Sequence, residues 1–121
     1  MATHLNTGKH GERIAANFLV QKGYEIKATN YRFGKAEIDL IAQKDGVLVF
    51  VEVKTRRSSK FGLPEEAVHH RKQRALVKAA NAFVYEHEIH SEIRFDIISV
   101  SINNHNISIH HIEDAFFPLC D

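Results

Sequence analysis

The sequence predicts one α/β domain in which helices flank a mixed sheet, with the elements in the order αβββαββ. Three observations predict this class. The chain has 121 residues, enough for one core. Two segments carry apolar residues at helical spacing, and five others read as strands. Hydrophobic residues make up 44% and charged residues 26% of the chain, as in ordinary globular proteins. We therefore expect residues 1–121 to form a single domain.

The first helix is expected to end before Gly23, which stands where a glycine caps the C-terminus of a helix. Asn6 or Thr7 can cap its N-terminus. Apolar residues recur between these caps at helical spacing: Ile14, Ala15, Phe18 and Leu19. Residues 24–29 then predict a strand, and residues 30–36 a basic loop.

The clearest local signal is Asp45-Gly46, which separates two strand-like runs, residues 37–44 and 47–55. A type I′ turn needs two residues that tolerate positive φ, so this dipeptide predicts a two-residue hairpin. Lys44 would then pair with Val47, and the numbers of paired residues would sum to 91.

The second half of the chain predicts one long helix and two strands. Pro64 can open a helix over residues 65–87, with a break near residue 70, and residues 93–102 and 107–112 read as strands. The first three strands should form an antiparallel meander. The helix should act as a crossover, which returns the fourth strand parallel to a strand already in the sheet.

The predicted hairpin register places four charged residues on one face. Asp39 would lie opposite Glu52, and Glu37 opposite Lys54. Opposed carboxylates repel each other, and a divalent cation can compensate because Mg²⁺ prefers carboxylate, water and phosphate oxygens. Lys54 can then hold a phosphate oxygen or orient a water. The alternative is an exposed face with a Glu37–Lys54 salt bridge, worth about 0–1 kcal/mol.

The run AEIDLIAQKDGVLVFVEVK resembles the core of PD-(D/E)XK nucleases, in which an acid on one strand precedes Glu-x-Lys on the next. The ordered set GERIAANFLVQKGY, NYR, AEIDLIA, VFVEVKTR, FG-P-EAV, a helical Lys and RFDIISV is similar to the YraN-like family of uncharacterised bacterial proteins. That family resembles archaeal Holliday-junction resolvases. The resemblance covers residues 8 to about 115 and implies a restriction-endonuclease-like fold.

The resemblance also implies a site for Mg²⁺ or Mn²⁺. Its members would be the metal ligands Asp39, Glu52 and the carbonyl of Val53, the catalytic Lys54, and the helix acid Glu12. Ala36 departs from the family, which usually has Gly there. This methyl group could alter the loop before the strand, but it removes no ligand.

Basic residues concentrate in the first two-thirds of the chain. Residues 1–78 hold 15 of the 16 Lys and Arg and 8 of the 15 acids, a net charge of +7; residues 79–121 hold one Arg and 7 acids, a net −6. This division indicates a face that attracts polyanions, or chance clustering on a solvated surface. Candidate phosphate contacts are Arg13, Arg32, Lys35, Arg56, Arg57, Lys60 and Lys72. For Lys72 a helix-surface role stays open.

Other residues give weaker signals. Histidines occur as adjacent pairs at residues 69–70 and 110–111, and the side chains of adjacent residues point in different directions. No His-Glu-x-x-His motif occurs, so we favour no histidine metal site. Asp96 is expected to pair with Arg94 or a neighbouring strand. The single cysteine, Cys120, cannot form an internal disulfide.

Together these patterns predict a metal-dependent endonuclease that hydrolyses DNA phosphodiester bonds, including those of branched or junction DNA. An RNA substrate is not separable from DNA by sequence. The alternative is a non-catalytic nucleic-acid-binding protein on a nuclease fold. No apolar run reaches the roughly 18–20 residues of a membrane helix, and the N-terminus lacks a secretory pattern, so we expect a cytoplasmic protein without a membrane partner. The oligomeric state, including a homodimer, stays open.

Overall fold

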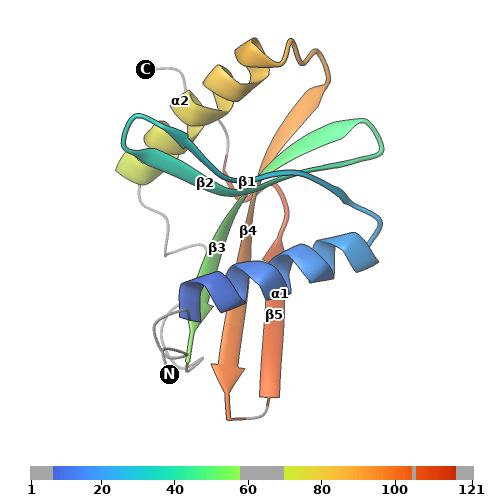
Figure 1. Ribbon diagram of the computed structural model, residues 1–121, viewed down its shortest axis with the longest axis vertical. Helices are drawn as coiled ribbons and strands as arrows, with labels where there is room; N and C mark the ends of the chain where they lie inside the picture. The colour runs from blue at the N-terminus through green and yellow to red at the C-terminus, as the bar shows by residue number, and fades with distance from the viewer. Residues whose placement is uncertain (1–6, 58–69, 105, 117–121) are drawn as a thin grey trace.

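The computed structural model describes residues 7–57, 70–104 and 106–116 (Figure 1). Its elements are α1 (Thr7–Gln21), β1 (Glu25–Phe33), β2 (Ala36–Lys44), β3 (Val47–Arg56), α2 (His70–Glu86), β4 (Glu92–Asn103) and β5 (Asn106–Ile112). This order confirms the predicted αβββαββ arrangement. The strands form one sheet in the order β1-β2-β3-β4-β5, in which β3 and β4 are parallel and the other neighbours antiparallel. The predicted meander and parallel return of the fourth strand are therefore confirmed.

The two helices cover opposite faces of the sheet, and Figure 1 shows α1 crossing one face while α2 lies on the other side. The core under α2 contains Ile38, Ile41, Leu48, Phe50, Phe95, Ile97, Leu76 and Phe83. The core under α1 contains Ala15, Leu19, Leu40, Val49, Val51, Ile98 and Val100. Because both faces are covered, β3 and β4 are buried along most of their length, in agreement with the continuous apolar run of β3 at residues 47–51.

The β2–β3 hairpin has the predicted register. Asp45 and Gly46 adopt φ values of 52° and 78°, as a turn of the I′ kind requires. Pairing runs from Lys44 opposite Val47 to Leu40 opposite Val51, so the numbers of paired residues sum to 91. The local turn chemistry thus sets which residues of β2 and β3 lie side by side.

The predicted basic loop at residues 30–36 is wrong over most of its length. Strand β1 continues to Phe33 and pairs with β2 up to Phe33 opposite Ala36, which leaves Gly34 and Lys35 as the turn. Pairing with β2 outweighs the polar composition of this segment, because the extended backbone finds its hydrogen-bond partners in the neighbouring strand. Asn30 lies inside this longer strand with a φ of 51°.

Other element predictions need smaller changes. Gly23 has a φ of 97° just after α1, as expected for a C-terminal glycine. Of the predicted helix 65–87, the structure describes His70–Glu86. Lys60, Pro64 and the rest of residues 58–69 lie outside the described residues, as do Asn6 and Cys120.

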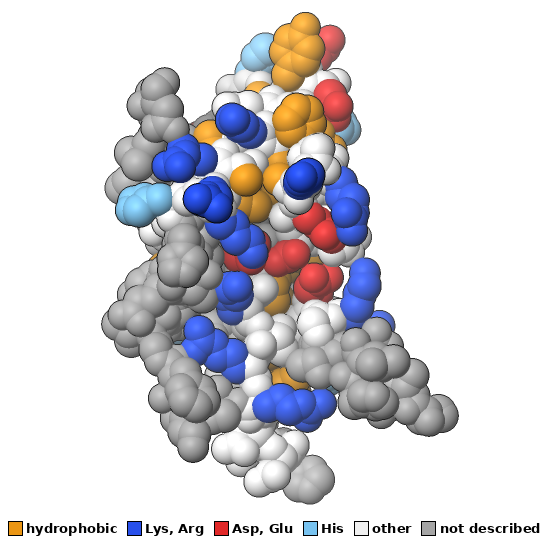
Figure 2. Space-filling view, turned by 90° about the vertical axis from the view of Figure 1, so that its left-hand side faces the viewer, with side chains coloured by type: hydrophobic (Ala, Val, Ile, Leu, Met, Phe, Trp, Pro, Cys, Tyr) orange, Lys and Arg blue, Asp and Glu red, His pale blue; other side chains and the backbone are white. Residues whose placement is uncertain are grey.

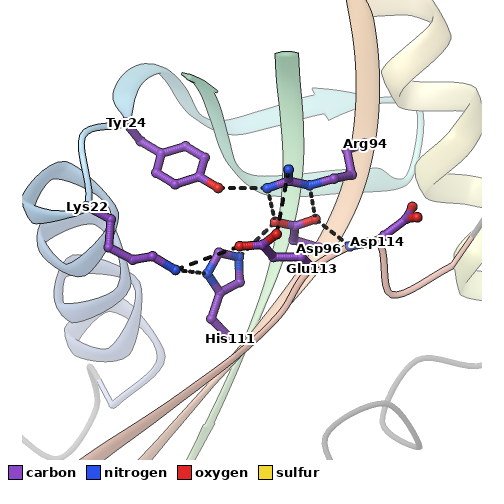
Figure 3. Close-up of polar contacts among 7 residues, drawn as sticks. All are labelled: Lys22, Tyr24, Arg94, Asp96, His111, Glu113 and Asp114. Atoms are coloured by element: carbon purple, nitrogen blue, oxygen red, sulfur yellow. Dashed lines mark hydrogen bonds and ion pairs between the residues drawn. The ribbon is translucent and has the colours of Figure 1, made fainter. Parts of the chain in front are cut away.

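Asp96, with no exposed surface, lies at the centre of a polar network that joins three parts of the fold (Figure 3). Arg94 donates two hydrogen bonds of 2.9 Å to its carboxylate, and His111 of β5 and the Asp114 N–H contact it at 2.8 and 2.9 Å. Arg94 also donates to the Tyr24 hydroxyl at 2.7 Å. The predicted pairing of Asp96 with Arg94 and a neighbouring strand is confirmed.

The charge state of this network follows from its contacts. Burial by itself would raise the pKa of Asp96, but the hydrogen bonds from His111, Arg94 and the Asp114 N–H outweigh it and hold that pKa below its usual value. Lys22 Nζ lies 2.9 Å from His111 Nδ1. An ammonium can only donate, so Nδ1 accepts, and the ring hydrogen on Nε2 points to Asp96. His111 therefore serves a structural pairing in this network.

Within the described ranges, neither helix is both long enough and apolar enough to cross a membrane.

Candidate active site

Asp39 lies where the β2–β3 pairing stops. The paired ladder ends at Leu40 opposite Val51, one residue before the predicted Asp39–Glu52 pair. Asp39 Oδ2 instead accepts a hydrogen bond of 2.8 Å from the backbone N–H of Val53. This contact holds the Asp39 carboxylate against β3 at the open end of the hairpin, away from its turn. Val53 is itself nearly buried in the core under α1.

A cleft of about 360 Å³ opens at this point, between the end of the hairpin and the start of α2. Its lining residues are Lys35, Ala36, Glu37, Asp39, Glu52, Lys72, Ala75 and Leu76. The structure therefore brings Asp39 and Glu52 into one cleft. Figure 2 shows acidic side chains gathered in the middle of this face, with Lys and Arg side chains around them.

Glu52 is the more deeply placed acid, with a side chain only 5% exposed. Lys72 Nζ of α2 lies 2.6 Å from Glu52 Oε2, and Lys54 Nζ lies 4.0 Å from the same oxygen. Lys72 thus lines the cleft, whereas Lys54 is linked to it through Glu52 and is not one of its lining residues. Lys54 pairs with Glu52 rather than with Glu37, which forms an ion pair of 3.4 Å with Arg32.

The pKa of Asp39 is raised to about 7. Burial is the largest cause, and the negative charge of Glu52 is the second; Glu12 adds to the rise. The Val53 N–H and the Lys72 ammonium oppose it. Such a shift by burial and a neighbouring like charge, in a cleft, is typical of functional carboxylates, although structural ion pairs can produce it too.

Glu12 reaches this region from α1 because α1 passes very close to β3. A Cβ added at Gly11 would lie 1.8 Å from Thr55 Oγ1, so only glycine permits this approach. The next residue, Glu12, accepts a hydrogen bond of 3.2 Å from the Asn30 side-chain amide. Its negative charge is one of the smaller causes of the raised pKa of Asp39.

No sequence pattern identified Gly11 or Asn30 as residues that support the site. Gly11 looks unremarkable inside a helix, and its role depends on Thr55, which is 44 positions away. The sequence pattern places Asn30 in the predicted loop of residues 30–36. The available signal was an asparagine between strand-forming residues, since asparagine tolerates positive φ better than most residues.

The donor set suits a hard divalent cation. Two carboxylates, Asp39 and Glu52, share a cleft, and the pKa of Asp39 is raised first by burial and second by the negative charge of Glu52. Over residues 7–57, 70–104 and 106–116, no group of three or more His, Cys, Asp and Glu side chains is close enough to hold a metal ion. A cation here would therefore rely on two carboxylates together with waters and a substrate oxygen, the ligand set of Mg²⁺.

The predicted phosphate contacts are distributed unevenly. Lys35 and Lys72 line the cleft, and Arg32 pairs with Glu37 beside it. Arg56 ends β3 two residues after Lys54, and Arg57 follows it in an exposed position. Arg13 is exposed on α1, next to Glu12. Contact of Lys72 with Glu52 places it in the cleft, while its contact with substrate stays a prediction.

Comparison with known proteins identifies close relatives over nearly the whole chain. The sequence profile described as "Uncharacterised protein family UPF0102" matches residues 11–100. A UPF0102 protein of Flavobacterium psychrophilum is 50% identical over 117 residues, which cover 97% of this chain and 98% of the relative. UPF0102 proteins of Christiangramia forsetii and Caldicellulosiruptor bescii are 46% and 45% identical, covering 97% and 90% of this chain and 98% and 95% of the relatives. These matches confirm the resemblance to YraN-like proteins.

Proposed function

The chain belongs to the UPF0102 family, and from this premise we propose that it is a metal-dependent endonuclease that hydrolyses DNA phosphodiester bonds. The proposal includes branched or junction DNA among its substrates. The observation that supports it best is the convergence of Asp39 and Glu52 in one cleft, with Lys54 at 4.0 Å from Glu52.

The chemistry assigned to each residue follows from its surroundings. Asp39 and Glu52 would hold Mg²⁺ or Mn²⁺, which when bound would stabilise negative charge on the scissile phosphate. Lys54 would contact a phosphate oxygen or orient the attacking water. The Val53 N–H fixes one oxygen of Asp39, leaving the other to face the cleft. The pKa of Asp39 is about 7 without a metal, so binding of the cation at neutral pH would favour the deprotonated carboxylate.

DNA is proposed as the substrate from the charges around the cleft. Lys35 and Lys72 line it, and Arg32 lies beside it. Phosphate contacts of this kind position a nucleic acid but do not read its sequence. Recognition of shape, as at a junction or flap, is therefore a better match than recognition of a base sequence.

A second candidate is a non-catalytic nucleic-acid-binding protein, favoured by the Lys72–Glu52 contact of 2.6 Å. A lysine at this distance partly neutralises Glu52 without a metal, and a binding protein could keep the acid for this ion pair alone. The two candidates differ in whether a divalent cation is needed.

A cleavage screen separates these candidates. Duplex, single-stranded, flapped and four-way-junction DNA, with matched RNA strands, would be incubated with Mg²⁺ or Mn²⁺, using wild type and Asp39→Ala. Metal-dependent cutting of at least one DNA by wild type, lost in Asp39→Ala, supports the endonuclease. Tight, salt-dependent binding without cutting of any substrate supports the binding protein. Cutting of RNA alone would overturn the choice of DNA.

A further inference from the structure

Asn30 occupies an unusual position in the middle of β1. Its φ of 51° lies in the left-handed region, where residues other than glycine are uncommon. Such a conformation is unfavourable for most residues and less so for asparagine, whose short polar side chain can hydrogen-bond locally. Residues inside a strand are normally extended, so the strand itself does not explain the positive φ of Asn30. The contacts of its side chain supply a reason.

The Asn30 amide nitrogen bridges two carboxylates from different elements. Nδ2 donates to Glu12 Oε1 of α1 at 3.2 Å and to Glu37 Oε2 of β2 at 2.7 Å. An amide nitrogen carries two hydrogens, so one side chain can serve both acids. The amide is neutral and does not compensate either charge. Its effect is to hold the two acids in place.

The held position of Glu12 matters to the cleft. Glu37, the other acid that Asn30 contacts, lines the cleft, so the same amide links Glu12 to the edge of the cleft. The close approach of Gly11 to Thr55 brings the α1 backbone near β3, but it does not determine the direction of the flexible Glu12 side chain. Asn30 is the described contact that does so.

We propose that Asn30 is a positioning residue that holds Glu12 at the edge of the Asp39–Glu52 cleft, where Glu12 acts on a bound divalent cation through water. This inference rests on the proposed metal site, to which the resemblance already assigns Glu12, and it adds the role of Asn30. Action through water agrees with the absence, across the parts of the chain described, of a three-acid group close enough for direct ligation. Mg²⁺ usually keeps several of its waters, which can donate to an outer carboxylate.

The test measures Mn²⁺ affinity by isothermal titration calorimetry for wild type, Asn30→Gly, Glu12→Gln and the double variant. Glycine keeps the positive φ without strain and removes only the amide. We expect Asn30→Gly to weaken Mn²⁺ binding about tenfold, as for other outer contacts of metal sites. In the Glu12→Gln background the same change should have little effect, because Asn30 acts through Glu12.

Asn104 offers a matched control. It also has positive φ, 56°, but it lies in the exposed turn between β4 and β5. Asn104→Gly should leave Mn²⁺ affinity unchanged. A crystal structure of metal-free Asn30→Gly provides a readout independent of metal, and Glu12 should leave its position there.

Three outcomes would overturn the inference. If Asn30→Gly binds Mn²⁺ as tightly as wild type does, Asn30 does not act through Glu12. The same conclusion follows if Asn30→Gly lowers the Mn²⁺ affinity equally in the wild-type and Glu12→Gln proteins. In either case the proposed function stands. If Glu12 keeps its position in the metal-free variant, Asn30 does not hold it. If wild type binds no Mn²⁺, the proposed metal site fails, and this inference fails with it.

Discussion

Lys72 Nζ lies 2.6 Å from Glu52 Oε2, so the most buried acid of the cleft already has a cationic partner from α2. A divalent cation at Glu52 would meet this ammonium. The ion pair and the metal are therefore expected to compete for the same carboxylate.

Replacement of Lys72 by methionine tests this competition. Lys72→Met should raise Mn²⁺ affinity several-fold, because a repelling charge is removed. It should also lower metal-free stability by about 1–2 kcal/mol, since Glu52 loses a partner; the half-exposed lysine keeps this below the cost of breaking a fully buried pair. Calorimetric titration and urea unfolding measure the two effects. Lys78→Met, at an exposed position on the same helix, is the control. Weaker Mn²⁺ binding in Lys72→Met would instead make Lys72 part of the binding machinery.

The raised pKa of Asp39 predicts a pH-dependent stability. Between about pH 4 and pH 7, Asp39 keeps its proton in the folded state and has lost it in the unfolded state. The free energy of unfolding therefore falls as pH rises through this range, and it falls no further through Asp39 above about pH 7. Asp39→Asn should remove this decline. The variant should be more stable than wild type at pH 8, on the order of 1–2 kcal/mol, and equal near pH 4. Urea unfolding across this range measures the difference.

The same Asp39→Asn variant should lose the stabilisation by metal. Binding to the folded state raises stability by RT ln(1 + [L]/Kd), so Mn²⁺ should raise the Tm of wild type and leave that of the variant unchanged. A large loss of stability in metal-free Asp39→Asn at pH 8 would contradict both expectations and indicate a structural ion pair.

Lys54 separates catalysis from binding. Lys54→Ala should reduce cleavage by about 10²–10³ while most DNA affinity remains, because affinity comes from many dispersed phosphate contacts. The combined change Arg56→Ala and Arg57→Ala should do the reverse, with weaker binding and cleavage that recovers at high enzyme concentration. Single-turnover rates and salt-dependent binding measure both effects. Equal losses of rate and affinity in Lys54→Ala would mean that this lysine is only one more phosphate contact.

Gly11 tests whether α1 positions the site. Gly11→Ala places a Cβ 1.8 Å from Thr55 Oγ1, so α1 must move away from β3. We expect a loss of about 1–3 kcal/mol in stability and weaker Mn²⁺ binding, because Glu12 moves with the helix. Gly8→Ala is the control, since nothing lies within 4 Å of its added Cβ, and it should be neutral or stabilising. Urea unfolding and Mn²⁺ titration of the two variants measure these effects. Equal stability and equal Mn²⁺ affinity of Gly11→Ala and Gly8→Ala would show that α1 tolerates the added Cβ.

Asp96 should behave opposite to Asp39. The pKa of Asp96 is lower in the folded protein than in the unfolded chain. Asp96 therefore adds stability above the pKa of the unfolded state, and this stability is lost as pH falls through the lower pKa of the folded state. Asp96→Asn leaves the partly buried Arg94 with only Glu113, 3.9 Å away, as a charged partner, and should cost about 3 kcal/mol at pH 7, without changing Mn²⁺ affinity. Urea unfolding and Mn²⁺ titration test the two statements, and a change in Mn²⁺ affinity would link this network to the cleft.

The sequence by itself determined the order of the elements, the β2–β3 register and the acids brought near each other by it. These features depend on local chemistry. Asp45 and Gly46 tolerate the positive φ of a tight turn, and the pairing carries the register along the hairpin as far as Leu40 and Val51, next to the two acids. A helix between two strands of one sheet likewise favours a parallel return, as β3 and β4 show.

Only the tertiary structure decided how far β1 extends, which cation contacts Glu52, and what holds Glu12. Lys72 is 20 positions from Glu52, and Asn30 is 18 from Glu12. Such contacts depend on how α1 and α2 pack on opposite faces of the sheet, which no local pattern encodes. The raised pKa of Asp39 has the same origin, because burial and the charges of Glu52 and Glu12 exist only once the sheet and both helices have assembled.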